Sequence, residues 1–132
     1  RLDRLQALAA TNPNIEVHEL DVTNQASVDN FVKAINGRAV DVLINNAGIS
    51  KSAMSWKQNS EDWKYTMAIN LDAPFFLSKA FLPAMRANGF GRIINITSVV
   101  AQTGAIGTAA YSASKAGLIG LTKTIAKLFP HF

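Results

Sequence analysis

Residues 93–123, IINITSVVAQTGAIGTAAYSASKAGLIGLTK, combine a short apolar run, a loop of small residues and a helix. The run Ile93–Ile96 predicts a buried strand that carries Ser98 just beyond its carboxyl end. Small residues make up most of the segment 99–108, which predicts a loop. A helix is expected to begin near Ala109. This strand, loop and helix are the frame around which the rest of the chain is interpreted.

The expected helix carries Tyr111 and Lys115 four residues apart. Residues at this spacing are neighbours on one helical face, so the phenol and the amine can share a pocket. Tyrosine has a pKa of about 10, and a nearby cation favours the phenolate, which suits acid/base chemistry near neutrality. Ser98, from another element, is placed to hydrogen-bond a substrate oxygen. A Tyr-x-x-x-Lys pair alone is more often an ordinary surface pair, so its surroundings decide the interpretation.

Composition limits the classes of protein to consider. The chain has 132 residues, 48% of them hydrophobic, which is enough to form one globular domain over residues 1–132. The net charge is +4, but the basic residues are scattered without interleaved aromatics, so no nucleic-acid surface is expected. With no cysteine, no metal-ligand spacing and no long apolar run, we expect neither a metal nor a membrane span.

The chain before residue 93 alternates helical and extended patterns. Leucines at helical spacing predict a helix over residues 1–11, and alternating polarity predicts a strand over Ile15–Leu20. Thr23 or Asn24 is the expected N-cap of the next helix. The short run Val40–Ile44, apolar except for Asp41, predicts a strand buried on both faces, as in a parallel sheet. Together these elements indicate an α/β fold.

A long helix is expected from Glu61 to about Met85, with Ser60 as its N-cap. Pro74 interrupts this helix, and Asn70 lies just before the break. A distorted turn at that point would free backbone groups for other contacts.

Polar residues follow three of the predicted strands. Asp21, the segment Asn45–Gly48 and Ser98 each stand at or just beyond a strand's carboxyl end. Open parallel sheets bind ligands beyond the carboxyl ends of their strands. The pattern therefore predicts one ligand site at that edge.

The ordered motifs resemble those of the short-chain dehydrogenases/reductases, particularly the 3-oxoacyl-acyl-carrier-protein reductase-like members. The resemblance covers essentially residues 1–127. The matching segments are Asp21-Val22, Asn45-Asn46-Ala47-Gly48, Asn70 within Ile69-Asn70-Leu71, Ser98 within Ile96-Thr97-Ser98, and Tyr111-Ser112-Ala113-Ser114-Lys115. This family has a doubly wound parallel sheet and transfers hydride between NAD(P)(H) and a ketone or secondary alcohol.

The resemblance implies four catalytic residues. Tyr111 is expected to act as the general acid in reduction and as the base in oxidation. Lys115 is expected to lower the pKa of Tyr111 and, with Tyr111, to bind the nicotinamide ribose. Ser98 is expected to polarise the substrate carbonyl, and Asn70 to hold a water molecule in a proton relay.

Five further residues are implied as cofactor contacts. Asp21 and Val22 match positions that contact adenine. Asn45, Ala47 and Gly48 match the stretch that lines the adenosine side and braces the sheet. The cofactor is expected to be NAD or NADP.

The chain also departs from the family pattern. No glycine-rich phosphate turn is present, and the only candidate glycines, Gly104 and Gly107, follow the third predicted strand. We therefore expect an internal fragment with a partial doubly wound sheet that lacks the first two strands and the last. Such a fragment is expected to be marginally stable because strand edges are left open. Arg1 and Arg4, near the missing strand, favour the phosphorylated cofactor NADP.

Two interpretations of function follow. In the first, the chain belongs to a cytoplasmic oxidoreductase with a small-molecule carbonyl or alcohol substrate. In the second, it is a truncated, non-catalytic product that only packs against other subunits. The helices over residues 60–85 and 109–128 correspond to those that many family members use to form homo-oligomers.

Overall fold

The computed structural model describes residues 2–35 and 38–128. The chain forms two compact units, Arg1–Gly37 and Arg38–Phe132. The two units are described separately. That residues 1–132 form one domain stays a prediction.

The first unit consists of two helices, α1 (Leu2–Thr11) and α2 (Gln25–Ala34). Asn24 is the N-cap of α2, since its side-chain oxygen accepts a hydrogen bond from the backbone N–H of Ser27. The predicted strand over Ile15–Leu20 is absent, and that prediction was wrong. Alternating polarity favours an extended chain, but a strand also needs a hydrogen-bonded neighbour. The one strand ladder in the described ranges lies in the second unit.

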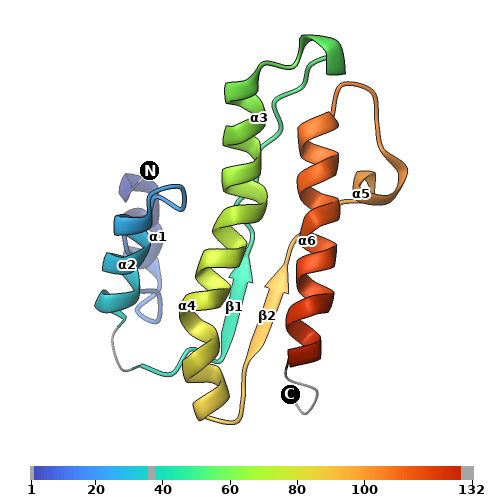
Figure 1. Cartoon of the computed structure of the whole chain (residues 1–132). Helices are drawn as coiled ribbons and strands as arrows, with labels where there is room; N and C mark the ends of the chain where they lie inside the picture. The colour runs from blue at the N-terminus through green and yellow to red at the C-terminus, as the bar shows by residue number, and fades with distance from the viewer. Residues whose placement is uncertain (1, 36–37, 129–132) are drawn as a thin grey trace. The chain divides into compact units, whose positions relative to one another are not determined.

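The second unit contains a two-stranded parallel sheet with long helices beside it (Figure 1). Strand β1 (Val42–Asn45) pairs with β2 (Arg92–Asn95), with Asn45 opposite Asn95. Because the strands are parallel, their carboxyl ends meet at one edge. The other elements are η1 (Ser55–Lys57), α3 (Ser60–Met67), η2 (Ala68–Asp72), α4 (Ala73–Ala87), α5 (Val100–Thr103) and α6 (Ala109–Leu128).

The long helix predicted after residue 60 is continuous but changes its winding. Segment η2 is π-helical and joins α3 to α4, with Asn70 at its centre. The distorted turn expected at Asn70 is thus confirmed. Pro74 lies in the first turn of α4, where the missing N–H is tolerated. The N-cap is Asn59 rather than Ser60, because the Asn59 side chain accepts a hydrogen bond from the Asp62 backbone N–H at 2.7 Å.

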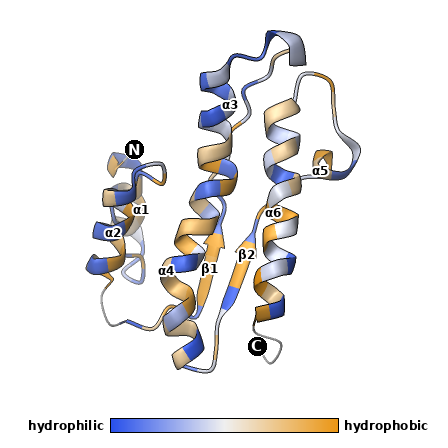
Figure 2. Ribbon diagram, viewed as in Figure 1, coloured by the Kyte–Doolittle hydropathy of each residue, from blue (hydrophilic) through white to orange (hydrophobic). Residues whose placement is uncertain are grey.

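One face of the sheet is exposed, so the expectation that β1 is buried on both faces was wrong. Val42 and Ile44 are 46% and 59% exposed, and Ile94 on β2 is 44% exposed. Leu43 and Asn45, at the alternate positions, are more buried. Strand β1 is apolar apart from Asn45, whereas β2 has two apolar residues between Arg92 and Asn95 (Figure 2). An apolar run shows that a strand can be buried but not how many layers cover it.

The core lies where α6 packs along α3 and η2 and where α4 packs against β1 (Figure 1). Leu118 on α6 and Phe81 on α4 are among the buried apolar side chains. Gly117 allows close packing, since a Cβ there would lie 2.9 Å from a methyl group of Leu71. This packing fixes α6 beside η2.

Candidate active site

Helix α6 places Tyr111 and Lys115 on one face, as their spacing predicts. The Lys115 Nζ lies 5.8 Å from the centroid of the Tyr111 ring. Thr108 stabilises the start of α6, where its carbonyl accepts the Ser112 N–H at 2.7 Å and the two hydroxyls lie 2.8 Å apart. The first turn of the helix therefore holds Tyr111 near the amine.

Lys115 is a buried cation tied to the end of β2. The residue is only 3% exposed, and Nζ donates a hydrogen bond to the Ile96 carbonyl at 2.7 Å. The Thr97 hydroxyl donates in turn to the Lys115 carbonyl at 3.1 Å. Burial lowers the pKa of the Lys115 amine, because removal from water disfavours the charged form. A neighbouring group that carries or develops negative charge would offset this cost.

Asn70 uses its amide to connect three segments. Its Oδ1 accepts the Ile49 backbone N–H at 2.9 Å, and Nδ2 donates to the Ile49 carbonyl at 2.8 Å. Nδ2 also donates to the Ser114 hydroxyl on α6 at 3.0 Å. Asn70 is fully buried, so these bonds replace contacts with water. The π-helical segment thus fixes residue 49 against α6.

Gly48 lies close against the amine of Lys115, where a side chain would be crowded. A Cβ at position 48 would lie 3.3 Å from Lys115 Nζ and 3.6 Å from Asn70 Oδ1. Ala47, like Gly48, is exposed. The backbone of residues 47–48 is therefore accessible directly beside the buried amine.

Asn45 is the last residue of β1, and only one of its two polar side-chain atoms forms a hydrogen bond among the described residues. Its Nδ2 donates to Asn95 Oδ1 at 2.8 Å, and Asn95 Nδ2 donates to the Thr122 hydroxyl on α6 at 2.9 Å. Asn45 Oδ1 is buried and has no hydrogen-bond partner among the described residues. Buried polar atoms are nearly always paired, so Oδ1 is an unused hydrogen-bond acceptor at the end of β1.

Ser98 lies three residues beyond β2, at the edge where the strands end. Its carbonyl accepts the Ala101 N–H at 3.0 Å. The segment expected to be a loop over residues 99–108 contains the short helix α5, so that expectation was wrong in part. Small residues are compatible with one helical turn as well as with a loop. Ser98 therefore lies at the junction of β2 and α5.

Asp21 and Val22 belong to the first unit and are described only there. The Asp21 carboxylate accepts hydrogen bonds from the hydroxyl and the backbone N–H of Thr23, at 2.7 and 2.9 Å. These bonds lower the pKa of Asp21, with the hydroxyl bond contributing most. Asp21 thus forms a local turn before α2.

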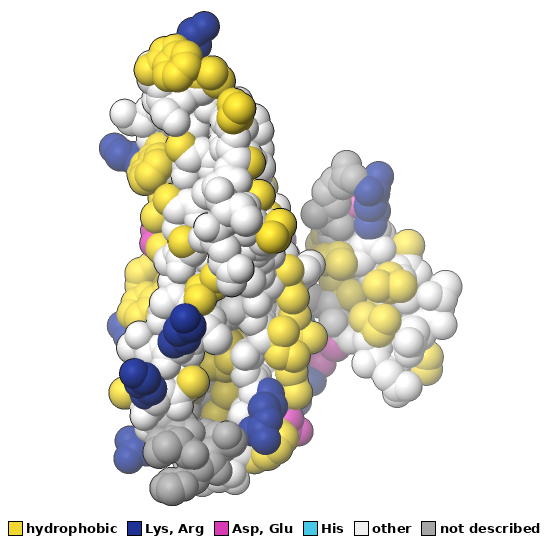
Figure 3. Space-filling view, turned by 90° about the vertical axis from the view of Figure 1, so that its right-hand side faces the viewer, with side chains coloured by type: hydrophobic (Ala, Val, Ile, Leu, Met, Phe, Trp, Pro, Cys, Tyr) yellow, Lys and Arg dark blue, Asp and Glu magenta, His cyan; other side chains and the backbone are white. Residues whose placement is uncertain are grey.

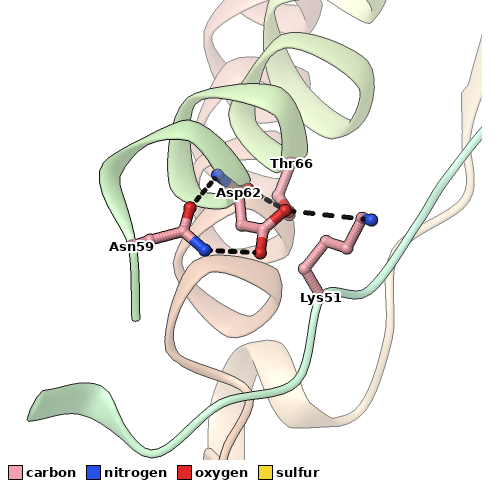
Figure 4. A network of polar contacts seen from close by, with 4 residues as sticks. All are labelled: Lys51, Asn59, Asp62 and Thr66. Atoms are coloured by element: carbon pink, nitrogen blue, oxygen red, sulfur yellow. Dashed lines mark hydrogen bonds and ion pairs between the residues drawn. The ribbon is translucent and has the colours of Figure 1, made fainter. Parts of the chain in front are cut away.

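A polar network fixes the segment after Gly48 to the start of α3 (Figure 4). Lys51 Nζ lies 3.8 Å from Asp62 Oδ1, and Asn59 Nδ2 donates to Asp62 Oδ2 at 2.8 Å. The Ala53 N–H also donates to the Gly107 carbonyl at 3.0 Å, in a parallel bridge. The segments on either side of the candidate site are thus joined.

The sequence did not single out several contributors to this site. Ile49 takes part through its backbone, which no residue type reveals. Asn95 carried a usable signal, because it is the polar residue within an otherwise apolar run. Thr97 and Ser114 are common residue types whose partners are distant in sequence.

The described residues also bear on metal binding, membrane insertion and nucleic-acid binding. In the described part of the chain, no three His, Cys, Asp or Glu residues are grouped as metal ligands. None of the helices among residues 2–35 and 38–128 combines the length and apolarity needed to cross a membrane. Lys and Arg side chains are distributed over the face in Figure 3 rather than gathered into a stripe.

The site therefore defines an α/β protein with a buried lysine, a tyrosine and open backbone at the carboxyl edge of its sheet. The chain belongs to the short chain dehydrogenase family, whose pattern matches residues 2–131.

Curated relatives include a 3-oxoacyl-[acyl-carrier-protein] reductase of Vibrio cholerae, 44% identical over 110 residues, which are 82% of this chain and 45% of the relative. An acetoacetyl-CoA reductase of Rhizobium meliloti is 44% identical over 116 residues, or 86% of this chain and 48% of that protein. The chain thus spans about half the length of the curated relatives it matches.

Solved structures agree with this family and fold. A short-chain dehydrogenase from Streptomyces avermitilis has a TM-score of 0.93 at 32% identity, over 99% of this chain and 51% of that one. A protein from Beutenbergia cavernae, assigned as an NAD(P)-dependent gluconate 5-dehydrogenase and solved with NADP, has a TM-score of 0.88 at 33% identity, over 97% and 52% of the two chains. The partial doubly wound α/β fold is confirmed.

Proposed function

We propose that this chain is part of an oxidoreductase that transfers hydride between NAD(P)(H) and a ketone or secondary alcohol. The observation that carries the proposal is the buried Lys115 amine beside the Tyr111 ring, at the carboxyl edge of a parallel sheet. The family membership and the reductase names of the relatives support it.

In this proposal, Tyr111 is the general acid/base. It donates its phenolic proton to the carbonyl oxygen during reduction and accepts the alcohol proton during oxidation. The Lys115 cation stabilises the phenolate that remains. Ser98 hydrogen-bonds the same substrate oxygen. Asn70 is proposed to hold the end of a water-mediated proton path, for which its position beside Ile49 and α6 is suitable.

The residues present fit a nicotinamide cofactor, which would supply or accept the hydride when bound. The open acceptor of Asn45, and the accessible backbone of Ala47 and Gly48 beside Lys115, support this fit. Lys115 and Tyr111 would bind the nicotinamide ribose, and Asn45, Ala47 and Gly48 the adenosine side.

We further propose that Asp21 and Val22 contact the adenine. The preference for NADP suggested by Arg1 and Arg4 also stays a proposal, although a structural relative was solved with NADP. Titration of the chain with NADH and NADPH, followed by nicotinamide fluorescence, tests both points. Asp21→Ala should weaken binding of both forms, and equal affinity for the two would contradict the NADP preference.

Turnover with an acetoacetyl thioester and NADPH tests the function directly, because reductases of such substrates are among the relatives. Saturable cofactor binding with turnover is the expected result. Absence of both would favour the alternative, a non-catalytic chain that only packs against other subunits. The cytoplasmic location stays a prediction that cell fractionation can test.

We also propose that the helices over residues 60–85 and 109–128 form an interface between copies of the protein, chiefly through α4 and α6. Two apolar hollows share Phe75, which is 44% exposed. One is completed by residues of α4 and α6 that include Ile125 and Leu128, the other by Phe76 and Leu121. Phe75→Asp should lower the mass measured by light scattering from oligomer to monomer. Phe90→Asp, at a similarly exposed phenylalanine, is the control.

A further inference from the structure

We propose that Ser114 is a positioning residue: its hydroxyl couples the Asn70 side chain to the turn of α6 that carries Tyr111. The inference rests on the proposed function, because its consequence is the placement of the acid/base. Ser114 itself need not touch the substrate or the cofactor.

The Ser114 hydroxyl both donates and accepts a hydrogen bond. The Oγ donates a hydrogen bond to the Tyr111 carbonyl at 2.8 Å and accepts one from Asn70 Nδ2 at 3.0 Å. A hydroxyl can donate and accept at once, whereas alanine can do neither. A helical serine that bonds only to its own preceding turn is ordinary. The second bond, from another element, sets Ser114 apart.

These bonds form a continuous connection between three segments. Ile49 bonds to Asn70 through both backbone groups, Asn70 bonds to Ser114, and Ser114 bonds to Tyr111. Ser114 and Asn70 are fully buried, so water cannot replace a lost partner. In a buried network, the loss of one member weakens the others as well.

The connection also sets Tyr111 relative to Lys115. Residue 48, next to Ile49, lies against the Lys115 amine, and Lys115 directly follows Ser114 in α6. The network therefore places the tyrosine turn and the lysine amine against the same short segment. Without the Ser114 hydroxyl, the first turn of α6 would be free to shift away from that segment.

The chain supplies a matched control in Ser78. Ser78 and Ser114 are both fully buried serines on helices. Ser78 Oγ has no hydrogen-bond partner among the described residues, whereas Ser114 has two. Substitution of either serine by alanine removes one buried hydroxyl oxygen. A difference between the two variants therefore comes from the hydrogen bonds of Ser114 and not from the loss of a buried hydroxyl.

The experiment uses the full chain as Ser114→Ala and Ser78→Ala. Hydrogen exchange of the Ile49 amide measures the coupling, and the ¹³Cζ chemical shift of Tyr111 at a fixed neutral pH measures the environment of the phenol. In Ser114→Ala, Ile49 exchange should accelerate about tenfold, as expected for one lost buried hydrogen bond. The ¹³Cζ resonance of Tyr111 should also move in Ser114→Ala, because the ring changes its position relative to Lys115.

Ser78→Ala should change neither quantity. The proposal is overturned if Ser114→Ala leaves both unchanged, or if Ser78→Ala changes them equally. If Ser114→Ala does not fold, Ser114→Cys replaces it, since the thiol has similar size but bonds weakly. Neither readout needs turnover, so failure of the proposed function would be seen separately, as an unmutated chain that turns over no carbonyl substrate.

Discussion

Two regions of the second unit distribute polar and apolar side chains in opposite ways. Around η2 and α6, polar side chains are buried and bonded, as in Asn70, Ser114 and Lys115. On the outer face of the sheet, apolar side chains such as Val42 and Ile44 are exposed. Burial of a polar group costs free energy unless the group forms a hydrogen bond. An exposed apolar group costs little, because the protein only lacks the stabilisation that burial of that group would give.

The comparison shows which part of the protein is self-sufficient. The buried polar region takes its main contacts from residues 48–49, η2 and α6, all within the second unit. The outer face of the sheet obtains no such cover from the described residues of that unit. Substitutions in the polar region should therefore have large effects, and those on the outer face small ones.

The largest effect is expected at Tyr111. Tyr111→Phe should lower turnover of a carbonyl substrate by about 10³-fold, because general acid/base catalysis contributes about that much. Cofactor affinity, measured by nicotinamide fluorescence, should remain within about threefold. Tyr65→Phe, at an exposed tyrosine of α3, is the control. Unchanged turnover in Tyr111→Phe would refute its assignment as the acid/base.

Asn70→Ala tests how much the buried hydrogen bonds among Asn70, Ile49 and Ser114 contribute to the free energy of unfolding. The change removes the Asn70 partner of both backbone groups of Ile49 and leaves the Ser114 hydroxyl with only its bond to the Tyr111 carbonyl. The free energy of unfolding should fall by about 2–3 kcal/mol, measured by urea denaturation. Asn88→Ala, at the exposed end of α4, should cost less than about 0.5 kcal/mol. Equal losses in the two variants would remove the distinction between the regions.

Lys115 links the buried region to pH. Burial lowers its pKa in the folded chain below the ordinary value of 10.5. Between the folded pKa and 10.5, the unfolded chain binds more protons, so the free energy of unfolding rises with pH, by at most about 1.4 kcal/mol per pH unit. Lys115→Met should remove this slope in urea denaturation at several alkaline pH values. Lys123→Met, at an exposed lysine of the same helix, should retain it.

The smallest effect is expected on the outer face of the sheet. Ile44→Thr keeps a β-branched residue at an exposed position, so the free energy of unfolding should change by less than about 0.5 kcal/mol. Leu118→Ala, in the core, should cost about 3 kcal/mol by comparison. A large loss from Ile44→Thr would mean that this face is covered in solution.

The sequence predicted several elements closely because their signals are local. The 3.6-residue period marked α1, and the possible N-caps Thr23 and Asn24 marked the start of α2, where Asn24 is the cap. It failed over Ile15–Leu20, where the expected strand is absent. The pattern there was alternating, but a strand exists only with a neighbour, and pairing is not a local property.

For the candidate site, the sequence by itself determined which chemical groups are present and which share a helix turn. The spacing of Tyr111 and Lys115 on α6 required only helical geometry. Only the tertiary structure decided that Lys115 is buried, that Asn70 faces Ile49, and that Ser114 bonds to Asn70. The physical reason is distance along the chain: Asn70 and Ser114 are separated by 44 residues. Their contact depends on how α6 packs against η2, which no local pattern encodes.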